Sequence, residues 1–318
     1  MRKTRLCELL GIEYPIIQGA MHWIANGELA AAVSEAGGLG IVAPGAGWDG
    51  QGERKDNLRL QIRAAKERTK RPFGVNITVG DPNARELIEV ITAEGVPVVT
   101  TSAGNPATLT PVLKEKGIKV LHVVASCRHA AGAERAGVDA VIAEGFEAGG
   151  HNGMDELTTF TLVPQVVDAV KIPVVAAGGI ADARGFVATL ALGAEGVQMG
   201  TRFVATTECC AHPSFKQAVV EALDTSTIIT GRKIGPTRGI KNAFTARMME
   251  LEAAGADADQ LEEFIGLGRS PAGQLRGDLE QGELYCGSIA GLVTEIVGAG
   301  EVVRRIVAEA DAIIARLR

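Results

Sequence analysis

The chain has 318 residues, of which 46% are hydrophobic and 22% charged, enough for one large core or for a large and a small domain. Its net charge of −6 excludes the positive potential that attracts nucleic acid or an anionic membrane surface. Five cysteines without a C-x-x-C pair indicate neither a disulfide framework nor a zinc site. No apolar run of about 18 residues predicts a membrane span, so we expect a cytoplasmic protein.

Eight short, apolar and β-branched runs recur before residue 200, with room for a helix after each. Their nearly continuous hydrophobicity is typical of parallel strands covered on both faces. The predicted strands are residues 14–18, 39–42, 73–77, 97–101, 119–124, 140–143, 173–177 and 196–199. The predicted intervening helices include residues 28–36, 57–68, 85–94, 107–116 and 183–192. This α/β alternation favours a (β/α)8 TIM barrel over an open doubly wound sheet, which stays the alternative fold.

The pattern changes after Arg202, where strand-like runs stop and helix-like runs are separated by glycine and proline. The expected helices are residues 215–223, 240–253 and 258–265. They predict a small, mainly helical substrate-binding cap at residues 206–289, inserted late in the chain. Residues 301–318 have the spacing of an amphipathic helix that would close the ring of barrel helices. The barrel domain would then comprise residues 1–205 and 290–318.

A glycine-rich loop at residues 45–50 matches the G-x-G-x-x-G spacing of a dinucleotide-binding turn. Pro44 interrupts the strand-to-turn geometry that such a turn needs, and no acidic residue stands at the end of the next strand, where Asn76 occurs. We therefore interpret residues 45–50 as an ordinary loop after the second strand.

Two further glycine-containing loops follow the seventh and eighth predicted strands, at residues 176–180 and 199–203. In TIM barrels these two loops commonly form a phosphate site from backbone N–H groups and a helix N-terminus. Either loop alone would more often be a tight turn, but the pair at the expected strands predicts phosphate binding. The residues that would form this site are Gly178, Gly179, Gly200 and Thr201.

His151 lies between Gly149–Gly150 and Gly153 in the segment that leaves the sixth predicted strand. A histidine at the carboxyl end of a barrel strand can transfer a proton near neutral pH, so we prefer a catalytic role to that of a surface-loop histidine. The other histidines lack the spacing of metal ligands, and a metal site is not supported. His122, inside a strand run, is interpreted as a core histidine.

Other residues could also reach the same end of the barrel. Residues 18–21 and Asn76 follow strands one and three and could contact a planar heterocycle. The expected cap contains a basic run that we interpret first as a solvated face, with contact to the phosphates of a nucleotide or phosphopantetheine as the alternative. Its members are Arg232, Lys233, Arg238, Lys241 and Arg247.

Taken together, these motifs resemble the nitronate monooxygenase family, formerly called 2-nitropropane dioxygenases, which includes the flavin-dependent enoyl-ACP reductase II of fatty acid metabolism. The likeness covers essentially the whole chain and is carried by residues 14–21, 72–77, 147–151, 176–180 and 199–203. It implies bound FMN, with the phosphate at the two glycine loops and the isoalloxazine ring near Ala20, Met21 and Asn76. His151 would be the catalytic residue. The implied cofactor-binding residues are Gly19, Ala20, Met21, Asn76, Glu144, Gly150, Gly178, Gly179, Ile180, Gln198, Gly200 and Thr201.

Within this family, several motifs are similar to the enoyl reductase branch, among them residues 98–106, 141–145, 158–163, 240–242 and 287–293. Residues 128–130 and 145–147 are instead similar to the nitronate monooxygenase and NADH:quinone reductase branch. Ala20 departs from the second glycine that many relatives carry, and Val123 departs from a lysine of some quinone reductases.

Three hypotheses follow. The first is reduction of enoyl thioesters, carried by acyl carrier protein or CoA, with NADH or NADPH as the electron donor. The second is oxidation of alkyl nitronates with O2 and without nicotinamide, and NADH:quinone reduction is a separate alternative after it. The third is a barrel without flavin that binds a sugar phosphate or only a ligand. The partner would be a small molecule or acyl thioester, and a homodimer is an open possibility.

Overall fold

The computed structural model describes residues 3–48 and 50–317. Its largest sheet has eight parallel strands in the order β1-β9-β8-β6-β5-β4-β3-β2. These strands are β1 (Ile16–Gln18), β2 (Ile41–Val42), β3 (Gly74–Thr78), β4 (Val98–Ser102), β5 (Lys119–Val124), β6 (Ala140–Glu144), β8 (Val174–Ala177) and β9 (Gly196–Met199). The ends of the sheet meet where Leu39, just before β2, pairs with Ile17 of β1. The sheet thus closes into the predicted TIM barrel, and the open-sheet alternative is wrong.

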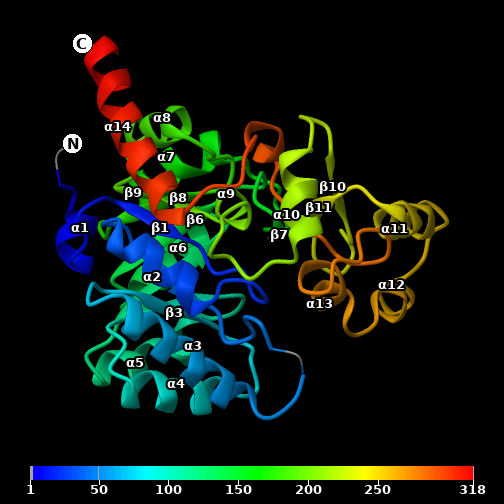
Figure 1. The fold of residues 1–318 in the computed structure, drawn as a ribbon, viewed down its shortest axis with the longest axis horizontal. Coiled ribbons are helices and arrows are strands. Elements are labelled where there is room, and N and C mark those ends of the chain that lie inside the picture. The colour runs from blue at the N-terminus through cyan, green and yellow to red at the C-terminus, as the bar shows by residue number, and fades with distance from the viewer. Residues whose placement is uncertain (1–2, 49, 318) are drawn as a thin grey trace.

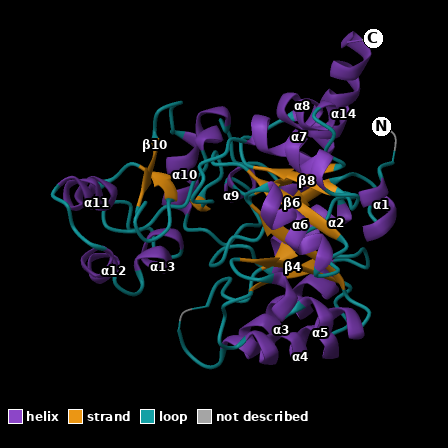
Figure 2. Ribbon diagram, turned by 180° about the vertical axis from the view of Figure 1, so that it is seen from behind, coloured by secondary structure: helices purple, strands orange, loops and turns teal. Residues whose placement is uncertain are grey.

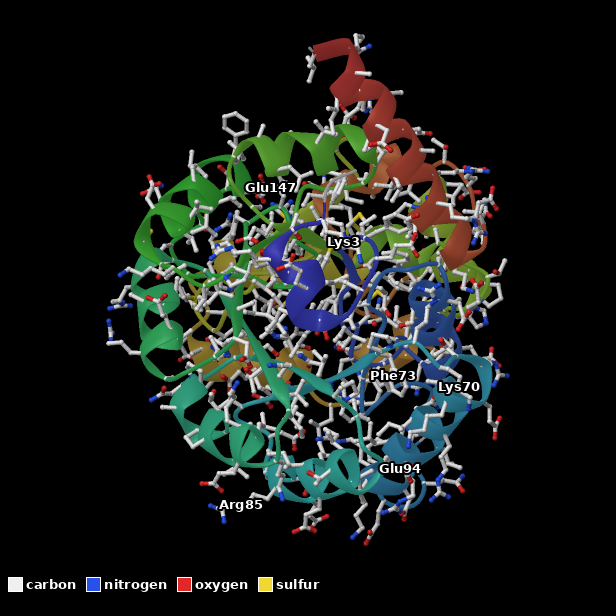
Figure 3. All side chains as sticks on the ribbon, turned by 90° about the vertical axis from the view of Figure 1, so that its left-hand side faces the viewer. Lys3, Lys70, Phe73, Arg85, Glu94 and Glu147 are labelled. Carbon is white, nitrogen blue, oxygen red and sulfur yellow. The ribbon has the colours of Figure 1, made fainter. Side chains whose placement is uncertain are left out.

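Helices surround the barrel as a ring, which Figure 3 shows along the barrel axis. The ring helices are α2 (Gly27–Glu35), α3 (Arg54–Arg68), α4 (Ala84–Ala93), α5 (Thr110–Glu115), α6 (Cys127–Arg135), α7 (Thr159–Ala169), α8 (Ala183–Ala191) and α14 (Ala299–Leu317). A short turn, η1 (Pro106–Thr108), precedes α5, and the four-residue α9 (Thr201–Val204) follows β9. The last helix, α14, packs against α8 and α2, so the chain's end completes the ring as the amphipathic spacing predicted.

The core has two layers because alternate side chains of each strand point to opposite faces. Outward side chains pack under the helices and form the larger layer. Inward side chains such as Ile17, Leu121 and Val175 form the inner layer, together with Leu6 and Leu10 of α1 (Arg5–Leu10). Figure 3, viewed from the side opposite the cap, shows α1 lying across that end of the barrel. The amino-terminal end of the barrel is therefore sealed by α1.

The late segment forms a separate layer at the other end of the barrel (Figures 1 and 2). Its elements are α10 (Pro213–Val220), β10 (Thr227–Thr230), β11 (Thr237–Ile240), α11 (Ala243–Ala253), α12 (Ala258–Ile265), α13 (Arg269–Gln274) and η2 (Ser288–Leu292). The three expected cap helices are present. The expectation that strands stop after Arg202 is wrong, because β10 and β11 form an antiparallel sheet with β7 (Gly150–His151).

The missed strands have a simple explanation. Thr227–Thr230 is β-branched throughout, but it begins and ends with threonine, whereas a predicted barrel run of equal length such as residues 140–143 is entirely apolar. Gly239 and Arg238 weaken the β-signal of Thr237–Ile240. Ile240 was assigned to the following helix, whereas the structure ends β11 there and begins α11 at Ala243, after the capping side chain of Asn242. Among the described residues, no helix is long and apolar enough to cross a membrane.

Candidate functional site

The candidate site lies at the mouth of the barrel, meaning the end where the carboxyl ends of the strands face the cap (Figures 1 and 2). In TIM-barrel enzymes the chemistry takes place at this end. The loops after β1, β6, β8 and β9 all open there and carry the residues predicted for cofactor binding and catalysis.

The loop after β8 has the conformation expected of a phosphate cradle. Gly178 and Gly179 have φ values of 83° and 74°, in the left-handed region that favours glycine. A Cβ atom at Gly178 would lie 2.7 Å from the carbonyl oxygen of Gly145, so a side chain cannot be accommodated without a shift of the backbone. Among the described residues, no hydrogen bond uses the N–H groups of Gly179 or Ile180. These two donors are free to bind an anion.

A carboxylate lies beside this loop. Glu147 accepts hydrogen bonds from the backbone N–H of Thr159 at 2.9 and 3.0 Å and from its hydroxyl at 3.0 Å. The carboxylate therefore sits at the N-terminus of α7, where negative charge is favourable. Its Oε1 is 3.5 Å from the position of a Cβ atom on Gly179. Glu147, labelled in Figure 3, thus forms one wall of the glycine loop.

The loops after β1 and β9 meet at the same mouth. The N–H of Gly19 donates to the carbonyl oxygen of Met199 at 2.9 Å, and a Cβ atom on Gly19 would lie 2.9 Å from Cγ of Gln198. Gly200 lies beside Met21, whose Cγ would be 3.8 Å from a Cβ position on the glycine, an ordinary van der Waals contact. The predicted residues of these two loops therefore form one continuous surface.

Two predicted polar contacts are already engaged within the protein. The hydroxyl of Thr201 accepts a hydrogen bond from the N–H of Gly287 at 2.9 Å, which ties the loop after β9 to η2. The side-chain amide of Asn76 donates to the hydroxyl of Thr100 at 3.0 Å and to its carbonyl oxygen at 3.2 Å. Neither bond prevents a ligand contact, since a hydroxyl and an amide each carry further donors or acceptors.

Glu144 ends β6 on the same strand face as Ala140 and Ile142, which belong to the inner core layer. Burial raises the pKa of its carboxyl from 4.5 to about 7 because the protein interior disfavours the charged form. No described residue donates a hydrogen bond to this carboxyl group. Burial therefore favours the protonated form of Glu144 more than in an exposed carboxyl group.

His151 reaches the mouth on a strand of the cap sheet and not on a free loop. It pairs with Thr237 of β11, while Gly150, with φ of 83°, pairs with Arg238. The His151 ring is exposed and lies edge-on to Tyr285, with 5.8 Å between ring centroids. The cap therefore positions the predicted catalytic ring, a role that sequence reasoning did not foresee.

Two basic residues at this mouth were missed. His22 follows Met21, and a Cβ atom on Gly45 would lie 3.0 Å from its Nε2, so its ring lies against the loop after β2. The pKa of His22 is lowered to about 4, first by burial and then by the positive charges of Arg54 and His151. Arg54, the first residue of α3, forms an ion pair with Asp81. The only sequence signal for His22 was its place at the end of β1, and Arg54 gave none.

The remaining predicted candidates have structural roles. His122 is buried and its Nδ1 is 2.7 Å from the hydroxyl of Thr101, which confirms the interpretation as a core histidine. Most of the basic cap residues are engaged within the chain. Arg232 pairs with Glu156, Arg247 pairs with Glu250, Lys233 donates to the carbonyl oxygen of Ala256, and Arg238 donates to that of Phe146.

This donor set fits FMN. The backbone N–H groups of Gly179, which has a left-handed conformation, and of the adjacent Ile180 are unengaged. Such a pair of donors suits a phosphomonoester. The stretch from Gly19 to Met21 has no bulky side chain before Met21, which suits close approach of a planar ring to its backbone, and Gln198 and Asn76 supply amide groups. The residues present are therefore chemically suited to the cofactor that the sequence motifs imply.

A family model described as nitronate monooxygenase matches residues 3–88 and 79–309. A probable nitronate monooxygenase from Staphylococcus saprophyticus is 35% identical over 98% of this chain and 99% of that protein. One from Staphylococcus aureus is 34% identical over 92% and 93%. Among solved structures, FabK from Thermotoga maritima is 46% identical, with a TM-score of 0.92 over 100% of this chain and 99% of that one. A nitroalkane oxidase from Streptomyces ansochromogenes is 29% identical, with a TM-score of 0.81 over 98% and 99%.

Proposed function

Because this chain belongs to the nitronate monooxygenase family and is a flavin-dependent oxidoreductase, we propose that it uses FMN and NADH or NADPH to reduce an enoyl thioester. The observation that carries this proposal is the full-length likeness to FabK, an enoyl-ACP reductase II, at 46% identity. The identity to the nitroalkane oxidase is lower, at 29%. The enoyl-reductase motifs noted in the sequence support the same choice.

Different residues at the mouth have different proposed roles. The N–H groups of Gly179 and Ile180 would hold the phosphate of FMN, and the backbone from Gly19 to Met21 would orient its ring. Bound FMN would carry electrons from the nicotinamide to the substrate. His151, exposed beside Tyr285 on a strand fixed by the cap, donates a proton or hydrogen bond to the acyl group. The cap is the surface for an acyl chain carried by acyl carrier protein or CoA.

A second candidate function is oxidation of alkyl nitronates with O2. One structural observation favours it: the positive charge of Arg54 acts on His22 at this mouth, and a cation suits an anionic substrate, while His22 itself is neutral at pH 7. The names of the curated relatives point the same way.

The two functions are separated by anaerobic addition of NADH or NADPH to the purified yellow protein. If the protein is an enoyl reductase, the flavin absorbance should fall rapidly and should rise again when an enoyl-CoA is added. Absorbance that persists with both nucleotides, together with turnover of a nitronate in O2, would overturn the proposal in favour of nitronate oxidation. Acid release followed by chromatography identifies the flavin, and recovery of FAD would contradict the single phosphate cradle.

A further inference from the structure

His151 needs a fixed orientation for proton transfer, yet little in the chain holds its side chain. The ring is exposed, and no hydrogen bond or ion pair engages its nitrogens among the residues that the structure describes. Pairing of β7 with β11 fixes the backbone of His151 but leaves its side-chain rotamers open. Holding a catalytic group in its productive orientation lowers the entropy cost of the reaction. A packing contact is therefore the remaining means of orienting this ring.

Tyr285 supplies such a contact. Its ring and that of His151 have centroids 5.8 Å apart and planes at 70°, which is a geometry that aromatic pairs favour. The same tyrosine lies beside Gly150, where a Cβ atom would be 3.8 Å from its Cγ and Cδ2. One aromatic side chain thus packs against both residues of β7.

The topology of the cap sheet places Tyr285 next to β7. Gly239 of β11 pairs with Ile228 of β10 on one edge and forms an isolated bridge to Tyr285. Residues Thr237 and Arg238 of β11 pair with β7. Because β10 occupies one edge of β11, Tyr285 continues the other edge, directly beyond the end of β7. The contact with His151 therefore follows from strand order and not from a loose loop.

The hydroxyl end of Tyr285 is anchored in the cap. It donates to Oε2 of Glu283 at 3.1 Å, and the same oxygen accepts from the hydroxyl of Ser270 on α13 at 2.5 Å. Burial, and then the negative charge of Glu283, raise the pKa of Tyr285, so its hydroxyl stays protonated and able to donate. The ring is thus held at one end by Glu283 and rests against β7 at its side.

We propose that Tyr285 is a positioning residue, whose ring, anchored at Glu283, holds the His151 ring in the orientation that proton transfer to the substrate needs. The proposal rests on the proposed function for the role of His151. Tyr285 acts through His151 and not on the substrate. Its removal should therefore slow the reaction only while His151 is present, which is what a double-mutant cycle measures.

The cycle combines Tyr285→Leu with His151→Ala and measures the rate at which an enoyl-CoA reoxidises the reduced flavin in a single turnover. We expect Tyr285→Leu alone to slow this step by about 10- to 100-fold, because a small displacement of a catalytic group is sufficient. In the His151→Ala background the same change should slow it by no more than about twofold. Tyr285→Phe keeps the ring and should recover most of the rate. The KM for enoyl-CoA and the rate of flavin reduction by NAD(P)H should not change.

Tyr14→Leu is the matched control, since Tyr14 is the only other tyrosine of the sequence, is also partly buried, and lies just before β1, away from the mouth. An equal loss from Tyr285→Leu in both backgrounds overturns the proposal, and so does a wild-type rate with His151 present. If Tyr285→Leu loses its flavin, Glu283→Ala replaces it, because it frees the hydroxyl and leaves the ring in place. It should slow reoxidation by about two- to tenfold, the effect of one lost hydrogen bond, and only while His151 is present.

The contact itself is measured without turnover, by NMR of the flavoprotein labelled at histidine. The ring protons of His151, identified by their loss in His151→Ala, lie beside an aromatic ring, so Tyr285→Leu should shift their signals and Tyr14→Leu should not. Unshifted signals overturn the proposal. If the wild type reduces no enoyl thioester, the proposed function fails, whereas the NMR shift and the same cycle measured with an alkyl nitronate still test Tyr285.

Discussion

Gly179 and Gly117 share a backbone conformation, with φ values of 74° and 73°, but have different surroundings. A Cβ atom on Gly117 meets nothing within 4 Å, whereas one on Gly179 faces the carboxylate of Glu147 at 3.5 Å. We expect each alanine substitution to cost about 1 kcal/mol of stability from backbone strain. Only Gly179→Ala should lower the ratio of FMN to protein, because its methyl group would crowd the anion-binding N–H groups. Equal flavin content in both variants would show that this loop does not hold the phosphate.

His151 is exposed, so its replacement should leave the fold intact. We expect His151→Ala to keep its FMN and visible spectrum while turnover falls by about 10²–10⁴-fold, the range for general acid–base assistance. Flavin reduction by NAD(P)H should be unaffected, and reoxidation by an enoyl thioester should slow. His129→Ala, at an exposed position on α6, is the control. If His151→Ala turns over both an enoyl thioester and a nitronate at wild-type rates, His151 has no catalytic role.

Glu144 should make stability depend on pH. Its folded pKa of about 7 lies above the ordinary 4.5, so the native state binds more protons than the unfolded state between these values. The free energy of unfolding that Glu144 contributes at low pH therefore decreases as the pH rises from about 4.5 to 7. The decrease is on the order of 3 kcal/mol. Urea unfolding should show Glu144→Gln more stable than wild type at pH 8 and similar at pH 5. A difference that is the same at both pH values contradicts the burial argument.

At this scale, sequence reasoning found residues whose identity is dictated by backbone geometry. The glycines of the β8 loop are required by positive φ and a close approach to Gly145, and glycine doublets are visible in a sequence. Arg54 could not be found in this way, because its partner Asp81 lies in the loop after β3, far from α3 in the sequence. The roles assigned to the individual cofactor-binding residues and to His151 stay predictions.

Among the elements, the strand that carries His151 depends on β11. Arg238 of β11 donates from Nε and Nη2 to the carbonyl oxygen of Phe146 at 3.2 and 3.0 Å, and its guanidinium lies 5.6 Å from the centre of the Phe146 ring. Its Nη1 donates to the hydroxyl of Thr227 on β10 at 3.3 Å. This one side chain therefore joins two cap strands to the segment before β7.

We expect Arg238→Gln to lower turnover by about 10- to 100-fold, because a small displacement of a catalytic group is sufficient for such a loss. Bound FMN should be retained, since the glycine loop is untouched. The matched control is Arg247→Gln, which removes an exposed arginine that pairs with Glu250 three residues away. Steady-state kinetics and flavin content distinguish the outcomes. Turnover equal to that of the control would show that the cap sheet does not position His151.

The eight barrel strands were predictable because each is a short apolar run between turn signals, a pattern set by burial on both faces. The cap strands were not, since Arg238 and Gly239 of β11 give little β-signal and the strand is stabilised by pairing with β10 and β7. The local sequence thus predicts strands that are buried uniformly on both faces. It does not predict strands whose formation depends on pairing with distant strands.

For the whole molecule, chain order was enough to predict the barrel and the late cap, because alternation of strand and helix permits few topologies. The proposed boundary at residues 206–289 stays a prediction, and β7 shows that a residue pair far outside that range belongs to the cap sheet. The distance in sequence between β7 and β11 is the reason that no local pattern revealed this connection.

The seal formed by α1 has a kinetic consequence. Leu6 of α1 packs against Gly196, where a Cβ atom would lie 2.4 Å from its Cδ2, and joins the inner core layer at that end of the barrel. If the proposed nicotinamide donor and the acceptor both enter at the mouth, we expect them to bind there one after the other. Initial rates measured over a grid of both concentrations should give parallel double-reciprocal lines, the signature of ping-pong turnover. Intersecting lines would mean that the two molecules bind together and that the mouth holds both at once.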